Sequence, residues 1–368
     1  MTGRPNCDRC RRNQAAIDVT RRNAGDVLEV SGARLLEEMV SRFVPPESAR
    51  HPATLSTVEA ADRGARRWTS VEVGPLTPGS AAHKRAICTM FRETFNPYRP
   101  SVIAWPTLGP DELRRLKSLP IWDIAVQTEG RARLSFAAFA DPLDDSEMRS
   151  TIMLNAWEEN RHKEVLSHLV RAYGIELAEE PPYLPPRDRE FAFLATGYSE
   201  SIDSFFAFGL FDLAKRSGFF PAELVETFEP VIQEECRHIL FFANWLAWHR
   251  ANLNWWRRIR FELRVAAAWV YIAGLRVGLA RSVGTSTKAK QQESNFTVSG
   301  AQAVTSVEIG IFDLMQICLQ ENDRRLAGYD PRLCRPTRVP ALARFVLAVG
   351  KLWSGKKRNN GSSITDEF

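Results

Sequence analysis

The feature that most constrains this chain is a five-residue pattern, E-E-x-R-H, which occurs at residues 158–162 and again at 234–238. Each copy contains a Glu-x-x-His, made by Glu159 with His162 and by Glu235 with His238. Because three residues turn an α-helix by about 300°, the Glu and the His of each copy leave the same helix face about one turn apart. One carboxylate and one imidazole from each helix could therefore reach a common metal site.

Two further glutamates lie at similar distances before the two motifs. Glu129 precedes Glu159 by thirty residues, and Glu200 precedes Glu235 by thirty-five. A dinuclear carboxylate site in a four-helix bundle takes one Glu from each of two helices and a Glu-x-x-His from each of two others. The alternative is a pair of solvated helices with salt-bridged faces. Apolar sequence follows both motifs, at residues 166–170 and 239–245, and this favours buried helices.

The order Glu, E-x-x-H, Glu, E-x-x-H resembles the ferritin-like di-iron carboxylate superfamily over residues 120–250. The resemblance implies an all-α fold: a ferritin-like four-helix bundle with a long crossover between helices two and three, plus additional N- and C-terminal helices. It also implies six metal ligands, namely the bridging Glu159 and Glu235, the terminal Glu129 and Glu200, and the histidines His162 and His238.

The donor set also bears on which metal is expected. Carboxylate oxygens with a single imidazole for each ion suit Fe or Mn, and they disfavour a closed structural zinc site. We therefore expect two Fe ions, with Mn as the alternative.

Helix start and stop signals predict where the four bundle helices lie along the chain. We expect these helices to start at Pro120, Ser146, Asp188 and Pro221 and to end near Asp141, Gly174, Gly218 and Asn252. Pro230 lies inside the fourth, and it indicates either a kink or a later helix start. The proline-rich residues 175–187 could span roughly 40 Å when extended, enough for a crossover along the bundle. An interdomain linker is the alternative for this segment.

Composition and helix-breaking residues predict four regions along the chain. They are a loosely ordered extension (1–79), the bundle with preceding short helices (80–256), additional helices packed on it (257–353) and a polar tail (354–368). Cys7 and Cys10 form a C-x-x-C without a second copy, and we interpret them as incidental thiols. The net charge of +5 comes from basic residues spread over the chain, so nucleic acid is not an expected partner. The six cysteines suggest no disulfide framework, and no secretory signal is recognised, so a cytoplasmic location is expected.

Residues 255–281 are rich in Arg and Trp and contain an apolar run at 265–275. Eleven residues are too few to span a bilayer. We favour a helix packed on the bundle, and an interfacial membrane helix is the alternative.

Several residues near the motifs are expected to act outside the ligand set. Glu158 and Glu234 are interpreted as charges beside the ligands or at the surface, with Arg161 and Arg237 as ion-pair partners of such carboxylates. Asp203 could accept the ring N–H of a ligand histidine, or could be an ordinary helix-face charge. Cys236 is interpreted as a packed neighbour.

Thr196 and Ser204 share a helix face with Glu200 and are the candidate catalytic residues, with Ser204 as a candidate proton donor. Small side chains on this face and on that of Glu129 would leave volume beside the metals. Four phenylalanines could wall this volume as an apolar pocket, and simple core packing is the alternative for each: Phe205, Phe206, Phe208 and Phe211.

The resemblance favours a di-iron oxidase or oxygenase that uses O2, an external electron donor and a small organic substrate, apolar or an aromatic amine. The arylamine N-oxygenases of this superfamily are similar in size, but Val231 stands where they place an additional His. One alternative is an iron-oxidising or peroxide-reducing protein of the ferritin or rubrerythrin type, and a second is a non-catalytic helical protein. A homodimer is left open.

Overall fold

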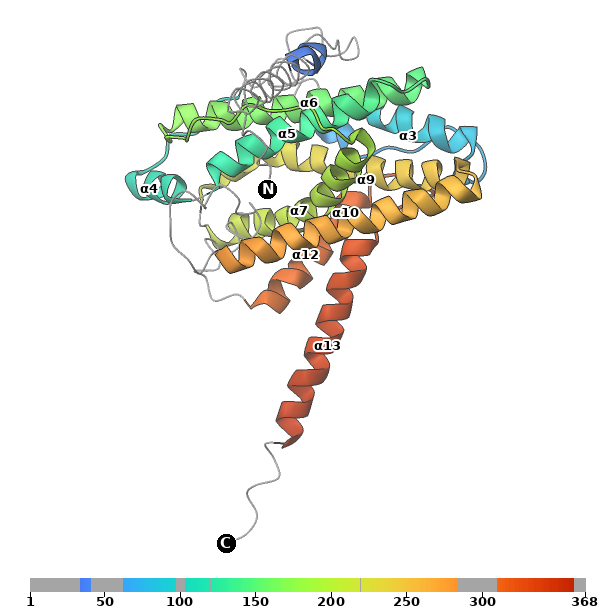
Figure 1. Ribbon diagram of the computed structural model, residues 1–368. Coiled ribbons are helices and arrows are strands. Elements are labelled where there is room, and N and C mark those ends of the chain that lie inside the picture. Colours follow the sequence, from blue (N-terminus) through green and yellow to red (C-terminus); the bar gives the residue numbers. More distant parts are fainter. Residues whose placement is uncertain are drawn as a thin grey trace, which may run out of the picture.

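The computed structural model describes residues 34–40, 62–96, 103–119, 121–218, 220–282 and 310–360. These residues form an all-α protein, apart from one isolated β-bridge between Trp68 and Tyr329. Figure 1 shows most helices gathered side by side in one body, from which a single helix projects. The C-x-x-C at Cys7 and Cys10 and the end of the tail lie outside the described residues. So do residues 284–298, whose polar sequence predicts a loop.

The centre of the body consists of four long helices, α5 (Trp122–Ala140), α6 (Ser146–Ala172), α7 (Arg189–Ser217) and α9 (Glu229–Asn252). Helix α5 packs against α6 and α7, and α7 packs against α9. A further helix, α3 (Ala81–Glu93), contacts both α6 and α9. These are the four helices expected from the sequence, and a helical bundle is the arrangement that their contacts support.

The ends of these helices follow local capping chemistry. The Asp145 carboxylate accepts a hydrogen bond from the Met148 N–H at 3.1 Å, so α6 is capped one residue before the expected Ser146. Asp188 caps α7 in the same way, and Gly218 ends it with φ of +64°, a conformation that favours glycine.

Pro230 marks a helix start and not a kink. A short helix, α8 (Ala222–Thr227), ends before it, and α9 begins at Glu229 with Pro230 in its first turn. Proline is tolerated there because the first N–H groups of a helix have no intrahelical acceptor.

The remaining helices surround this centre. They are α4 (Pro110–Ser118), α10 (Trp255–Ser282), α12 (Ile311–Leu326) and α13 (Arg338–Asn360). Helix α10 packs against α7, whereas α12 packs against α7 and α9. Helix α13 touches α12 and α7 and then leaves the body (Figure 1). Among the described residues, no helix combines the length and the hydropathy that crossing a membrane requires.

Two glycines let neighbouring helices approach α7 closely. A Cβ atom on Gly197 would lie 2.4 Å from the ring of Phe242 on α9. A Cβ atom on Gly209 would lie 2.4 Å from the Cys318 sulfur and 3.0 Å from the Cys318 backbone on α12. The second contact is the stricter one, since a backbone cannot rotate away as a side chain can.

Replacement of Gly209 by Ala should therefore destabilise the protein by about 1–3 kcal/mol, as overpacking does in other tightly packed cores. Gly274, on an open face of α10, has no atom within 4 Å of an added Cβ and provides the matched control. Gly274→Ala should be neutral or stabilising by up to about 1 kcal/mol because Ala is the better helix former. Urea unfolding of both variants measures the difference, and equal stabilities would contradict the close α7–α12 contact.

Candidate metal centre

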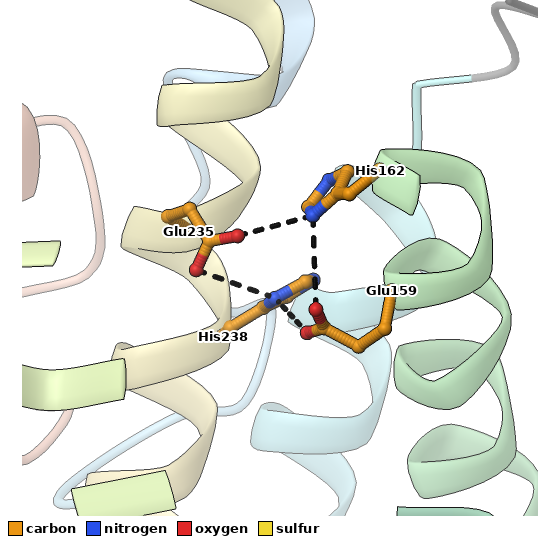
Figure 2. A group of neighbouring side chains, drawn as sticks. All are labelled: Glu159, His162, Glu235 and His238. Atoms are coloured by element: carbon orange, nitrogen blue, oxygen red, sulfur yellow. Dashed lines mark ion pairs between the residues drawn. The ribbon is translucent and has the colours of Figure 1, made fainter. Parts of the chain in front are cut away.

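The two E-E-x-R-H motifs meet inside the body. Figure 2 shows Glu159 and His162 reaching from α6 toward Glu235 and His238 of α9. One ligand atom from each of the four residues lies within 4.8 Å of the others. Glu159, His162 and His238 are buried, and Glu235 is partly exposed, so the cluster is a buried Glu2His2 group that could hold a metal ion.

Both histidines direct the same ring nitrogen into the cluster. The His238 Nδ1 atom lies 2.8 Å from Glu159 Oε1, and the His162 Nδ1 atom lies 3.0 Å from Glu235 Oε1. Each histidine is therefore closest to the carboxylate of the opposite helix, and the two rings stack with centroids 5.4 Å apart. In this arrangement both Nδ1 atoms face the space between the two carboxylates.

The other ring nitrogen of each histidine faces a second glutamate, again from the opposite helix. His162 Nε2 lies 2.7 Å from Glu234 Oε2, and His238 Nε2 lies 2.9 Å from Glu158 Oε2. We call Glu158 and Glu234 the outer carboxylates. Since an ionised carboxylate can only accept, Nε2 donates the hydrogen bond. This leaves the Nδ1 lone pair of each neutral imidazole free to bind a metal.

Each outer carboxylate also binds the arginine of the opposite motif. Arg237 Nη1 lies 3.1 Å from Glu158 Oε1, and Arg161 pairs with Glu234. All four side chains are essentially inaccessible to solvent. The nearby Arg237 guanidinium and the hydrogen bond from His238 outweigh the effect of burial and hold the pKa of Glu158 at about 2. Both outer carboxylates are buried and paired with arginines, which excludes the surface interpretation of Glu158 and Glu234.

Helix α3 and the residues after it hold the two arginines in place. Arg237 donates to the Phe91 carbonyl oxygen at 3.0 Å and to Thr94 Oγ1 at 2.8 Å, and Arg161 donates to the Asn96 carbonyl oxygen. Carbonyl groups at a helix C-terminus have no intrahelical donor and attract positive charge. The C-terminal end of α3 therefore completes a hydrogen-bond network that fixes both histidine rings.

Two more glutamates lie beside the cluster, Glu129 on α5 and Glu200 on α7. Burial, followed by the charges of Glu159 and Glu235, raises the pKa of Glu129 well above its ordinary value. Burial and the same two carboxylates raise the pKa of Glu200 in the same direction. We call Glu129, Glu159, Glu200 and Glu235 the centre carboxylates. Burial and the charges of Glu159 and Glu235 thus favour protonation of Glu129 and Glu200, or a cation that replaces these protons.

A metal ion fits this group of residues. Among the described residues fifteen buried side-chain polar atoms lack a hydrogen-bond partner, and four of them come together at this site: Glu159 Oε1, His162 Nδ1, Glu200 Oε1 and His238 Nδ1. The two Nδ1 atoms lie against the carboxylates of Glu159 and Glu235. The neighbouring carboxylates outweigh burial and raise the pKa of both histidines, that of His238 to about 9, so a metal ion would take the place of a proton at each Nδ1. Buried polar atoms are almost always satisfied in native proteins, so this set suggests a ligand that the atoms share.

The two candidate catalytic residues differ in their relation to the cluster. Ser204 is buried on α7, and its hydroxyl donates a hydrogen bond of 3.4 Å to Glu235 Oε2. Thr196 lies one turn before Glu200 and is half-buried. Within the described part of the chain no hydrogen bond joins Thr196 to the cluster. Ser204 is therefore the better placed hydroxyl.

The phenylalanines of α7 pack mainly against other helices. Phe205 packs with Leu314 and Cys318 of α12, and Phe208 lies under the guanidinium of Arg325, 5.2 Å from the ring centroid. Both rings are buried. This is the core-packing alternative for these side chains, and it gives no support to an open aromatic pocket beside the metals.

Of the two alternatives for Asp203, the structure supports the ordinary helix-face charge. Its carboxylate pairs with Arg276 of α10 at 2.9 Å, while the outer carboxylates accept from both histidines. The ring N–H of each histidine points toward a glutamate of the opposite motif helix, so it does not reach Asp203 on α7. The missed signal was the repeat itself, since the first Glu and the Arg occupy the same positions in both copies. Cys236 is a buried packed neighbour, as expected.

Searches against protein-family models, curated proteins and solved structures returned no match to this chain. The fold and the site by themselves define its class, an all-helical protein with a buried Glu/His cluster suited to a metal ion.

Proposed function

We propose that this protein is a non-haem di-iron oxidase or oxygenase of the ferritin-like type. In this proposal Glu129, Glu159, His162, Glu200, Glu235 and His238 bind two iron ions, with manganese as the alternative metal. When bound, the ions supply the activation of O2 for oxidation of a small organic substrate, with electrons from an external donor.

Charge balance is the observation that carries the proposal. The outer carboxylates are neutralised by Arg161 and Arg237. The four centre carboxylates, in contrast, have no cationic side chain of their own other than the two histidines, whose Nε2 protons are already used by the outer carboxylates. With metal bound, the two imidazoles would be neutral and the four centre carboxylates ionised, which would give four negative charges for two divalent cations to balance. A single zinc ion would leave half of this charge uncompensated in a buried site.

The chain's own residues have separate roles in this proposal. The outer carboxylates hold the Nε2 protons and so present the Nδ1 lone pairs of His162 and His238 inward. Ser204 donates to Glu235 and is the nearest hydroxyl from which a proton could move to that carboxylate. The surrounding apolar helices exclude water, which strengthens the electrostatic interactions within the site.

Anaerobic titration of the metal-free protein with Fe(II), followed by addition of O2, tests the proposal. We expect two irons per chain, an absorption change that requires O2, and O2 consumption that depends on an added reductant. An uptake of many irons per chain with formation of a mineral core would favour the ferritin-type alternative. A single zinc, or no stoichiometric metal, would contradict the proposed di-iron centre.

A further inference from the structure

Helix α10 is apolar on two opposite faces. Its inner stripe consists of Phe261, Val265, Ala268 and Ile272, all buried, and it packs the helix against the body. Successive residues of a helix are rotated by about 100°, so the face opposite the inner stripe can be read from the sequence. The residues on that face are Trp256, Ile259, Leu263, Ala266, Ala267, Val270, Ala273 and Gly274. We call these eight residues the outer stripe. All of them are exposed, and Leu263 and Val270 are 66% and 73% accessible.

The outer stripe is unusual for a helix at the edge of a helical body. Such a helix normally turns one apolar face inward and a charged face to water. The outer stripe instead carries no charged or polar side chain over about 27 Å of helix length. A continuous exposed apolar surface of this kind indicates a partner that covers it.

Basic and aromatic residues gather at the start of the same helix. Trp255 and Trp256 are both exposed and stack with ring centroids 3.9 Å apart. Arg257, Arg258 and Arg260 are exposed beside them, and none forms an ion pair within the described part of the chain.

The other described charges of α10 are turned toward the body. Arg264 pairs with Asp188 and Glu190, Arg276 pairs with Asp203, and the one carboxylate, Glu262, pairs with Arg250 of α9. The unpaired charge, at the exposed start of the helix, is therefore entirely positive. A second copy of this chain would bring like charges together across the same face, whereas an anionic surface would complement them.

We propose that α10 docks this protein onto an anionic lipid bilayer. The helix lies in the plane of the membrane surface, with the outer stripe among the acyl chains near the headgroups. Trp255 and Trp256 occupy the interface, and Arg257, Arg258 and Arg260 contact lipid phosphates. The inner stripe stays packed on the body, so docking needs no rearrangement of the metal centre and does not depend on its proposed chemistry.

Co-sedimentation of the full chain with vesicles tests this docking. The probes are phosphatidylcholine vesicles in which about a third of the lipid is phosphatidylglycerol, and vesicles of phosphatidylcholine alone. We expect binding to the anionic vesicles that weakens in 1 M salt, where the Debye length is only about 3 Å. Binding to the neutral vesicles should be at least about tenfold weaker.

Three variants distinguish how much the arginines and the outer stripe each contribute to vesicle binding. Arg257→Gln/Arg258→Gln/Arg260→Gln should lose roughly fivefold for each arginine, hence on the order of a hundredfold in the partition coefficient. Leu263→Glu/Val270→Glu should lose at least about tenfold by placing charge in the acyl region. Val73→Glu changes a side chain that is 98% exposed outside α10, and it should bind like the wild type. Circular dichroism verifies that all three fold.

Three results would overturn the proposal. One is no binding of the wild type to anionic vesicles, as expected if another part of this chain covers the outer stripe. Another is equal binding by the α10 variants and Val73→Glu. The third is a lipid-free dimer that Leu263→Glu/Val270→Glu converts to monomer in sedimentation velocity, since a second copy would then occupy the face.

Discussion

Glu159→Ala should reduce the metal content from two ions per chain to none after anaerobic Fe(II) loading and removal of free metal. Glu159 lies within 2.8 Å of His238 Nδ1 and 3.8 Å of His162 Nδ1, so its carboxylate faces both histidines. Its loss removes the oxygen ligands that both proposed ions would share. Elemental analysis of the desalted protein measures the effect, and His238→Ala should give the same result.

Glu164→Ala is the matched control for this loss. Glu164 lies on the same helix but is exposed, and its carboxylate accepts a hydrogen bond from the Asn160 side chain at 3.0 Å. The control should keep two ions. Two ions in Glu159→Ala, or equal metal loss in the control, would contradict this ligand assignment.

Glu158→Ala should destabilise the metal-free protein by about 3–5 kcal/mol, the usual cost of removing one partner from a buried ion pair. The variant leaves the buried Arg237 guanidinium without its carboxylate and His238 Nε2 without its acceptor. Glu158→Gln keeps an acceptor oxygen but not the charge, so this variant should lose less stability than Glu158→Ala. Denaturant unfolding in the presence of a chelator measures the free energy of unfolding in each case.

A surface ion pair provides the control for this second prediction. Asp111 pairs with Arg114, and both side chains are about three-quarters exposed. Asp111→Ala should cost at most about 1 kcal/mol. Similar losses in Asp111→Ala and Glu158→Ala would contradict the buried network. Glu158→Ala should weaken metal binding by roughly 10–100-fold without abolishing it, because the Nδ1 atom that faces the site remains.

Much of the helical framework could be predicted from the sequence. The four long helices of the body lie close to their expected ranges because their signals are local: Asp188 caps α7, and Gly218 ends it. The approach of the two Glu-x-x-His pairs was also predictable, since a spacing of three residues fixes a common helix face. Pro230 was ambiguous because a proline inside a helix and a proline in its first turn look alike in a sequence.

The partners of the outer carboxylates could not be assigned from the sequence. In the sequence Glu158 lies four residues before His162 on the same helix, and nothing local pairs it with the other motif. In the folded chain Glu158 binds His238 and Arg237, while His162 and Arg161 bind Glu234. This crossing depends on how α6 and α9 face each other and on the end of α3 above them, which are long-range contacts.

The sequence by itself determined which residues can share a helix face, where helices start and stop, and that two carboxylate–imidazole pairs repeat. These properties depend on backbone periodicity and on capping within one turn. Only the tertiary structure decided that each motif completes the other, and which of the two apolar faces of α10 is covered. Those properties depend on which surfaces meet when the helices pack, and helix periodicity is the same whether a face meets a neighbour or water.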